Sequence, residues 1–588
     1  MTKNIPRYLI TTSDERTWKF DRPVIFLGEW CRLYDRKHIW ENMDAIVAEP
    51  YGSDNSSGAL DNAKAREFEN KIFPRLCSSL NHYHGMQNSQ RFWKIILGHW
   101  LRHNIDVIIN RVKTLEQCLQ KNQISGTTFF RSDNFSLTAE DFNSSLSNFD
   151  DNRWNNILNE KILNLLDINI PFIEIIDYHS GFQSLRIKSS FSRVFFKWIH
   201  KYIGLFLSLF IRDNDAFIIN SYLPLKEEVK LHLALKQLPQ FWSKSNFKVQ
   251  KRPNSTIRQK LAKELTLTSK NSLMEILISL LFEFLPICFL EDFSNLNYLS
   301  KKQRWPKNPK FIFTCSNFYT DDVFKVWTAN QVESGTKYYT GQHGNNNGTM
   351  RLMIGVTEEV TCDKYLTWGW TDELLQHTPA FIFKTVGKVS KNYNPQGHLL
   401  LIQLHFPHRI MLRDEIFEFG QYFKAQQAFV GSLNPIPKEK LILRLHPTFD
   451  QYNWGEESRW KDFDSSLKID NSNINIRRLI SQSRLVIHSY DSTGILETLS
   501  QNIPTLAFWQ NDLEHLRDSA KPFYQLLIDA EIIHFTPESI AKKINEIWGD
   551  IDGWWAHKNV QECRRKFCNR YANNSQNPIQ ELKTILLN

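Results

Sequence analysis

The sequence predicts an α/β protein built from two Rossmann-like lobes, the first of which carries a large helical insertion. Two observations support this fold class. Strand-length apolar runs alternate with helical patterns in both halves of the chain, and polar loops follow the runs directly, as at the carboxyl ends of parallel strands. The length of 588 residues predicts three or four units of about 150 residues, and two lobes with insertions fit it equally well. We expect an N-terminal lobe over 1–385, its insertion at about 62–300, and a C-terminal lobe with closing helices over 386–588.

Short apolar runs predict the strands of the first lobe. They lie at 8–12, 24–27, 45–48, 216–219, 310–316, 337–341 and 364–367. Helical patterns fill 62–119 and most of 155–300, and a further helix is expected between 322 and 334. Residues 121–160 are rich in Asn, Ser and Asp and have little periodicity, so they predict loops.

The second lobe continues the alternation of strands and helices. Its expected strands are the apolar runs at 399–405, 440–445, 474–476, 485–487, 505–508 and 532–535. Helices are predicted over 409–430, directly after the polar turn at 488–493, and from 537 to the end. Strands joined in this way form a parallel sheet, and ligands of such sheets bind outside the carboxyl ends of the strands.

The charge balance limits the partners. Net charge is +9, a modest excess for this length, and no long Lys/Arg run or basic-aromatic repeat occurs. We therefore expect no nucleic-acid partner. The excess suits a phosphorylated or acidic substrate, or work beside an anionic membrane.

Cysteine spacing and apolar stretches predict the compartment. The eight cysteines form no Cys-x-x-Cys pair, which indicates reduced thiols, and the N-terminus lacks the apolar core of a signal peptide. The stretch at 203–211 is too short to span a membrane. That at 273–290 contains Glu275, Glu283 and Pro286 and predicts a buried core helix. We expect a cytoplasmic protein that can contact the inner face of the membrane peripherally.

The most informative segment is the polar turn that follows the apolar run at 485–487. Ser489, Asp491, Ser492 and Thr493 lie where the next helix begins. Hydroxyls and free backbone N–H groups at a helix start bind anions, and the helix dipole favours negative charge there. Glu497 follows one turn later, near enough to meet a ribose. The alternative is an ordinary capped helix.

A histidine ends the strand that lies upstream of this turn. The run at 440–445 stops at His446-Pro447. Proline ends the ladder, so the chain must open into a loop at His446. An imidazole there can donate to a phosphate or to a nucleotide hydroxyl. The alternative is a histidine that only caps the strand.

A third motif lies in the first lobe. Gln342-His343-Gly344 directly follows the strand at 337–341, and the glycine lets the backbone approach a ligand closely. His343 could act as a general base toward an acceptor hydroxyl, because its pKa lies near neutral pH. It could equally hold a donor phosphate. A tight polar turn with a structural use alone is the other interpretation.

Asp14 and Glu15 are the other candidates for the base, since they follow the first strand of the acceptor lobe. The alternative is a solvated loop, with Asp14 as an N-cap. No Asp-x-Asp pair follows a strand to hold a metal, so we expect metal-independent transfer without a cofactor.

These motifs resemble those of bacterial GT-B transferases that use cytidine-activated donors. Capsule Kdo transferases and polysialyltransferases carry a His-Pro motif and a Ser/Thr motif in the order seen here. CDP-glycerol glycerophosphotransferases also have a histidine-glycine turn in the first lobe, to which His343-Gly344 is similar. The segments 9–20 and 26–31 are similar to a family of transferases from bacterial surface-polysaccharide loci, and that similarity spans the chain.

The resemblance implies a GT-B-like fold in which His446 binds donor phosphate or cytidine and in which Ser489, Ser492 and Thr493 grip the phosphate. It implies transfer of a Kdo-like or other nonulosonic acid from a CMP-sugar to a glycan or lipid-linked glycan precursor of the bacterial surface. The acidic motif that supplies the base in many sialyltransferases is missing, so the base stays open. Transfer of a polyol phosphate from a CDP donor, a UDP-sugar donor and a non-catalytic scaffold are the alternatives.

Overall fold

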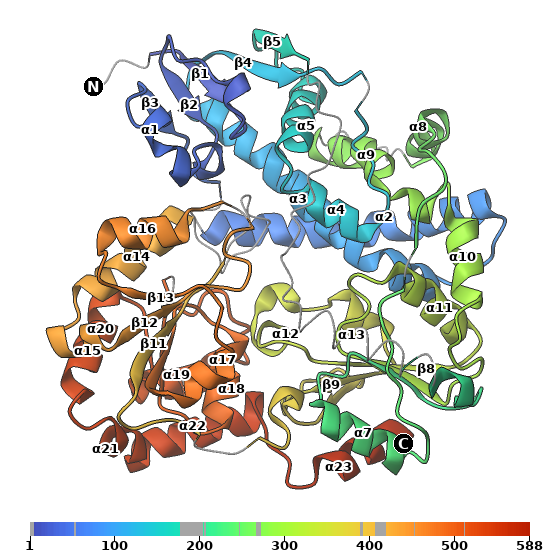
Figure 1. Ribbon diagram of the computed structural model, residues 1–588. Helices are drawn as coiled ribbons and strands as arrows, with labels where there is room; N and C mark the ends of the chain where they lie inside the picture. Colours follow the sequence, from blue (N-terminus) through green and yellow to red (C-terminus); the bar gives the residue numbers. More distant parts are fainter. Residues whose placement is uncertain are drawn as a thin grey trace.

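The computed structural model describes residues 5–51, 55–133, 135–176, 204, 207–245, 247–265, 272–388, 392–405, 419–451, 453–510 and 512–588. Three parallel β-sheets lie around the long helix α3 (Figure 1). The predicted α/β class with Rossmann-like lobes is confirmed. The region before residue 386 contributes two of the three sheets.

The first sheet is formed by the beginning of the chain. Its strands are β1 (Arg7–Ile10), β2 (Val24–Phe26), β3 (Ala45–Val47), β4 (Ile124–Phe130) and β5 (Phe172–Ile175). All pairs are parallel, in the order β3-β2-β1-β4-β5, so the direction of winding reverses between β1 and β4. The central strands β1 and β2 are buried almost throughout, as is usual when helices cover both faces of a parallel sheet.

The second sheet follows in the chain. Its strands are β6 (Phe217–Ile219), β7 (Phe311–Thr314), β8 (Lys337–Gly341), β9 (Lys364–Thr367) and β10 (His377–Pro379). They are parallel and lie in the order β10-β9-β8-β7-β6. The last helix of the chain, α23 (Pro578–Leu587), packs against α7 (Leu225–Ala234) of this region.

The third sheet has six strands. They are β11 (His398–Ile402), β12 (Leu441–Arg444), β13 (Lys468–Asp470), β14 (Ser483–His488), β15 (Thr505–Phe508) and β16 (Ile533–His534). Their order, β13-β12-β11-β14-β15-β16, is the Rossmann order 3-2-1-4-5-6. The winding therefore reverses between β11 and β14, where open α/β sheets bind their ligands.

The helices are distributed among the three sheets. Before β6 lie α1 (Lys37–Trp40), α2 (Asn55–His84), α3 (Gln90–Lys121), α4 (Phe142–Asn148) and α5 (Asn152–Leu165). With the second sheet lie α8 (Ser255–Glu264), α9 (Ser272–Phe284), α10 (Phe293–Lys301), α11 (Asp322–Glu333), α12 (Asn346–Thr349) and α13 (Thr357–Thr361). With the third lie α14 (Phe419–Gly431), α15 (Pro435–Glu439), α16 (Glu456–Phe463), α17 (Ile476–Ser481), α18 (Thr493–Ser500), α19 (Lys521–Asp529), α20 (Pro537–Ile547), α21 (Ile551–Ala556) and α22 (Lys558–Tyr571).

Helix α3 connects the first two sheets. Ser89 caps it by accepting from the backbone N–H of Phe92. Most of its 32 residues are buried. It packs against α5 of the first sheet and against α11 and α13 of the second. The approach to α13 is close: a Cβ on Gly98 would lie 2.6 Å from Oγ1 of Thr357. The position of α13 therefore depends on α3.

Two local predictions were wrong. The segment 121–160, expected as loops, contains β4, α4 and α5. Its polar residues start helices: Asp141 accepts from the backbone N–H of Ser144, and Asp151 from that of Trp154. Part of the Asp content of this segment therefore consists of helix N-caps and does not indicate loops.

The strand predicted at 474–476 is the second correction. The Asn475 side chain accepts from the backbone N–H of Arg477 and starts α17, while the strand β13 lies earlier, at Lys468–Asp470. The core helix predicted at 273–290 is confirmed up to Phe284 by α9, whose Leu280 and Leu281 are buried, and a separate 3-10 helix follows at Ile287–Phe289. The beginning of the helix predicted over 409–430 lies outside the described residues.

Candidate functional site

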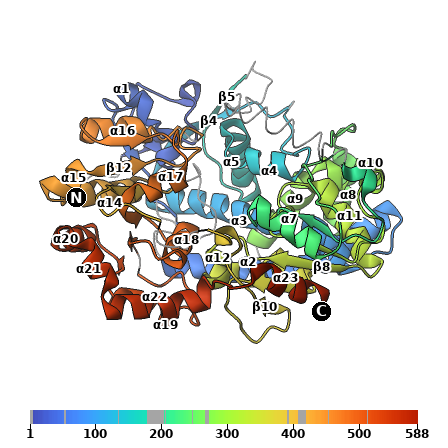
Figure 2. The ribbon, with the colours of Figure 1, turned by 60° about the horizontal axis from the view of Figure 1, so that its bottom comes forward.

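A cavity of about 540 Å³ lies outside the carboxyl ends of β11 and β14, at the reversal point of the third sheet. Its volume is within the usual range for small-molecule sites. The loops after β11, β14 and β15 form one wall, the loop after β8 with α12 and α13 forms a second, and α3 forms a third. Helices α12 and α18 lie side by side in both views (Figures 1 and 2).

The turn before α18 forms the polar floor of the cavity, and its hydroxyls differ in their partners. Ser489 donates to the carbonyl oxygen of Ile402 (2.9 Å) and lies 2.6 Å from the Tyr422 hydroxyl. Ser492 bonds Nδ1 of His488 (3.1 Å). Thr493 accepts from the backbone N–H of Asn345 (3.1 Å), which leaves its own hydroxyl hydrogen for a ligand.

Asp491 holds this turn in place. Its buried carboxylate accepts from Asn345 (2.6 Å), from the Tyr524 hydroxyl (2.9 and 3.0 Å) and from Nε2 of His515 (3.1 Å). Both oxygens are therefore engaged by protein donors. Because Asn345 follows β8, these bonds also connect the third sheet to the second.

The histidine-glycine turn contacts the serine turn at the cavity. A Cβ on Gly344 would lie 3.2 Å from Oγ1 of Thr493, so the close approach of the two loops favours glycine. Gln342 does not line the cavity. Its amide donates to the carbonyl oxygen of Gly344 (2.8 Å) and accepts from Trp368 N–H and the Trp370 indole, and so fixes the turn.

His343 lines the cavity between the two walls. Its ring packs edge-on against Tyr319, with 5.5 Å between centroids. Its Nδ1 is buried without a hydrogen-bond partner among the described residues. Burial lowers the pKa of His343, against the pull of the nearby Glu358 carboxylate, so the imidazole is uncharged at neutral pH.

A buried histidine–carboxylate pair lies on the α3 side of the cavity. Nε2 of His99 donates to Glu358 (3.0 Å), and Asn347 donates to the other carboxylate oxygen (3.3 Å). Burial would raise the pKa of Glu358, but the hydrogen bond and charge of His99, with His343 nearby, outweigh it and lower the pKa to about 2. The cavity therefore contains an ionised carboxylate on this wall.

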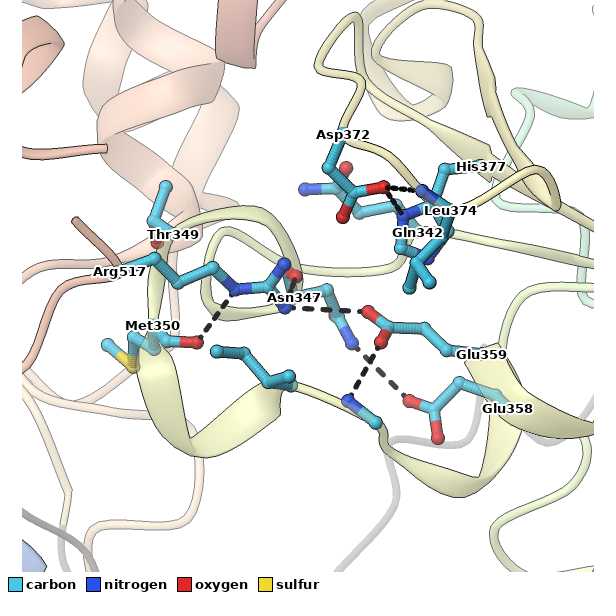
Figure 3. Close-up of polar contacts among 12 residues, drawn as sticks. Gln342, Asn347, Thr349, Met350, Glu358, Glu359, Asp372, Leu374, His377 and Arg517 are labelled. Atoms are coloured by element: carbon cyan, nitrogen blue, oxygen red, sulfur yellow. Dashed lines mark hydrogen bonds and ion pairs between the residues drawn. The ribbon is translucent and has the colours of Figure 1, made fainter. Parts of the chain in front are cut away.

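The loop behind this wall is anchored by an arginine from the third-sheet region (Figure 3). Arg517 donates to the carbonyl oxygens of Asn347 (2.7 Å) and Met350 (3.1 Å) and lies 3.5 Å from Glu359. Burial, with the charge of Glu358, raises the pKa of Glu359 to about 8 against the pull of Arg517. This network fixes the loop from which Asn347 reaches Glu358.

His446 and Pro447 follow β12, next to the strand whose end lines the cavity, but neither lines it. Pro447 is exposed. His446 stacks on His405 (5.6 Å between centroids), and its Nδ1 lies 2.9 Å from the Thr448 hydroxyl. Burial lowers the pKa of His446 to about 4, helped by the charges of His405 and Arg444.

The other predicted carboxylates also lie outside the cavity lining. Glu497 pairs with Lys384 (3.7 Å) and Lys388 (3.9 Å). Asp14 caps a short 3-10 helix (Glu15–Thr17) and pairs with Arg16 (2.5 Å). Glu15 accepts from Arg36 (2.7 and 2.8 Å), which lowers its pKa. Asp14 and Glu15 lie at the reversal point of the first sheet, each held by an arginine.

Among the polar residues of the cavity that sequence reasoning missed are His99, Tyr422, Glu358 and His515. His99 and Tyr422 stand within helices, where a polar residue has no distinguishing spacing. Glu358 and His515 lie in segments whose neighbours along the chain are ordinary charged residues. Their place in the site becomes apparent only in the folded structure, where α3, the region after β8 and the loops of the third sheet come together around the cavity.

Neither a metal site nor a membrane-spanning helix is found among the described residues. No group of three or more His, Cys, Asp or Glu side chains there is arranged to hold a metal ion. Among the described helices, none combines the length and the apolar character needed to cross a membrane.

Comparison with known proteins gives one family. The model of the LIC12162 family of transferases matches residues 7–586. A search of curated proteins gives no match.

Among solved structures, partial similarity is found to sugar and teichoic-acid enzymes. The spinosyn rhamnosyltransferase SpnG with thymidine diphosphate is 12% identical, over 50% of this chain and 80% of that one, with a TM-score of 0.28. A variant of the wall teichoic acid polymerase TagF, soaked with CDPG, is 13% identical, over 47% and 71%, with a TM-score of 0.26. MurG from Acinetobacter baumannii is 10% identical, over 63% and 90%, with a TM-score of 0.29. Structural similarity this low supports no conclusion about function, which has to rest on the family and on the cavity.

Proposed function

We propose that this chain, which belongs to the LIC12162 family of transferases, transfers a sugar from a nucleotide-activated donor to an acceptor hydroxyl. One observation carries the proposal. The cavity at the reversal point of a Rossmann-ordered sheet is lined by a helix start with a free hydroxyl and, in the turn that contacts it, by an uncharged histidine. A transferase needs these two functions, one for the leaving phosphate and one for the attacking hydroxyl.

The donor phosphate is assigned to the start of α18. The first N–H groups of a helix have no partner within the helix, and its dipole favours an anion there. Thr493 adds a hydroxyl whose hydrogen is available, whereas the Ser489 hydroxyl donates to Ile402 and the Ser492 hydroxyl is hydrogen-bonded to Nδ1 of His488. Thr493 and the helix start are therefore the proposed phosphate ligands.

The acceptor is assigned to the side of His343 and Glu358. A general base must be uncharged to take a proton, and the lowered pKa of His343 provides this at neutral pH. Its Nδ1 has no protein partner among the described residues. The ionised Glu358 favours the imidazolium that forms when His343 takes the proton.

In its finer form the proposal names a CMP-activated nonulosonic acid as donor and a bacterial surface-glycan precursor as acceptor. The order of the histidine-glycine, His-Pro and serine motifs supports the cytidine donor. A nucleotide with its phosphate at Thr493 can extend across the end of β11 toward His446, at the end of the adjacent strand. Metal-independent transfer at the cytoplasmic face of the membrane belongs to the same proposal.

Two alternatives are separable by their products. Transfer of a polyol phosphate from a CDP donor also releases CMP, but only that reaction leaves phosphorus in the product. A non-catalytic scaffold would release no nucleotide. The histidine-glycine turn at His343 favours polyol-phosphate transfer as the second candidate.

Calorimetric titration with CMP, CDP and UDP tests the donor site. Thr493→Val and His446→Ala should each weaken CMP or CDP binding by about 1.5–3 kcal/mol, the contribution of a hydrogen bond to a charged group. Thr536→Val is the matched control, because Thr536 also accepts a backbone N–H at a helix start of the same lobe. Absence of binding to all three nucleotides by folded wild-type protein would overturn the donor site.

A further inference from the structure

Two histidine–carboxylate pairs line the cavity. His99 with Glu358 lies on the α3 side, and His515 with Asp491 lies on the side of the third sheet. His515 is in the loop between β15 and α19, and its ring is buried. Because Asp491 directly precedes Ser492 and Thr493, His515 stands beside the start of α18.

One nitrogen of the His515 ring is engaged and the other is not. Nε2 donates to Oδ2 of Asp491 at 3.1 Å. Nδ1, on the other side of the imidazole, has no hydrogen-bond partner among the described residues. The Trp509 indole stands nearly perpendicular to the ring, at 87° with centroids 6.0 Å apart, and limits its rotation.

We propose that His515, oriented by Asp491, binds the phosphate of the donor through Nδ1 and stabilises it as the leaving group. This inference rests on the proposed function and adds a residue to it. The site would take the phosphate monoester of a nucleoside, or a diphosphate in the case of a polyol donor.

Charge at the floor of the cavity supports this role. A buried carboxylate next to a phosphate would repel it unless a cation lies between them. Asp491 has three donors, Asn345, Tyr524 and His515. Of these only His515 can carry a positive charge, so it is the group that can bridge the carboxylate and a phosphate.

In the reaction His343 acts on the acceptor, and His515 with Thr493 acts on the leaving phosphate. The acceptor oxygen bonds to the transferred carbon as its proton passes to His343. The bond between that carbon and the phosphate oxygen breaks, and the electron pair stays on the oxygen. Nδ1–H of His515 and the Thr493 hydroxyl donate to the phosphate as this charge develops.

The test compares CMP with cytidine, which lacks the phosphate. His515→Gln retains an N–H at the position of Nε2, so the bond to Asp491 can persist while the donor at Nδ1 is lost. We expect its affinity for CMP to fall roughly ten- to hundredfold, the effect of one hydrogen bond to a charged group, with cytidine affinity unchanged. His534→Gln is the matched control, since Nε2 of His534 also bonds a protein oxygen in this lobe.

Each outcome decides the inference. Selective loss of CMP affinity in His515→Gln, with the control at the wild-type value, supports it. Unchanged CMP affinity overturns it, and equal loss of CMP and cytidine overturns it by making His515 a structural residue. If wild-type protein binds neither compound, the proposed function fails first, and the inference fails with it.

Discussion

At the scale of single residues, the direction of hydroxyl hydrogens decides which part of the serine turn can meet a ligand. The Ser489 hydroxyl donates to Ile402 and the Ser492 hydroxyl is hydrogen-bonded to His488, whereas Thr493 keeps its hydrogen for a ligand. Asp491 is likewise saturated by protein donors. Ser489, Asp491 and Ser492 therefore maintain the shape of the turn, and Thr493 is available to bind a ligand.

His343→Ala tests the base at this scale. If His343 is the base, turnover should fall by about a hundred- to ten-thousandfold while nucleotide affinity stays close to the wild-type value. The measurements are single-turnover transfer and calorimetric titration with CMP. His557→Ala, at an exposed position, is the control. Parallel loss of binding and turnover would instead make His343 a ligand of the donor.

Glu359 gives a prediction for stability against pH. Its pKa is raised to about 8 in the folded protein from an ordinary 4.5, so the folded state holds a proton that the unfolded state releases between these values. Its stabilising contribution is complete below pH 4.5 and decreases as pH rises toward 8, by up to about 1.4 kcal/mol per pH unit.

Denaturant unfolding at several values between about pH 5 and 8 checks this. Glu359→Gln should flatten the fall in unfolding free energy with rising pH, because glutamine does not titrate. Glu546→Gln, an exposed position in α20, should leave the slope as in the wild type. An unchanged slope in Glu359→Gln would contradict the raised pKa.

The sequence could predict part of the site. His343, Gly344 and the residues 489, 491, 492 and 493 stand at strand ends, and all of them line the cavity. Glu358 and His515 could not be predicted, since their function depends on partners that are distant in the chain, His99 and Asp491.

At the scale of elements, strand-end loops could be predicted because apolar runs and the polar residues after them are local signals. The helices that begin at Asp141 and Asp151 were wrongly predicted as loops, since the polar residues that start helices also occur in loops. The packing of α3 against α13 has no local signal, because it depends on the absence of a side chain at Gly98.

Gly98→Val tests that packing. The added Cβ would meet the Thr357 side chain at 2.6–2.7 Å, so α13 has to shift, at a cost of about 1–3 kcal/mol in unfolding free energy. Transfer should slow as well, because Glu358 follows Thr357. Gly549→Val is the control, since a Cβ there meets nothing within 4 Å. Wild-type stability and turnover in Gly98→Val would show that α13 adapts freely.

At the scale of the whole molecule, the second sheet is the part to which the other two are attached. Helix α3 joins it to the first sheet. Buried bonds join it to the third: Asn345 to Asp491, Arg517 to Asn347, and Ile382 N–H to the carbonyl oxygen of Asn573 (2.9 Å). The sequence predicted two α/β lobes, and the region before residue 386 instead forms two separate sheets. Neither that division nor this attachment could be predicted, since the contacts concerned join residues far apart in the chain.

The first and third sheets meet along a more exposed edge. There the Tyr34 hydroxyl donates to Asp462 (2.6 Å) at the surface, and Arg459 lies over the Tyr34 ring. Exposed polar contacts of this kind contribute little, about 0–1 kcal/mol, whereas breaking a buried charged network costs about 3–5 kcal/mol. Opening of the cavity should therefore separate the first sheet from the third and leave the second and third together.

Hydrogen exchange measured by mass spectrometry checks this mode of opening. Amides in 342–350 and 512–520 should exchange slowly and together, because the side chain and the backbone N–H of Arg517 bind these loops to each other. Amides near Tyr34 and in α16 should exchange faster and slow on addition of CMP, as closure protects the edge. In Arg517→Met the two slow segments should lose their protection, while Tyr34→Phe should leave them unchanged. Fast exchange at 342–350 in the wild type, with protection near Tyr34, would reverse the assignment and place the moving boundary between the second and third sheets.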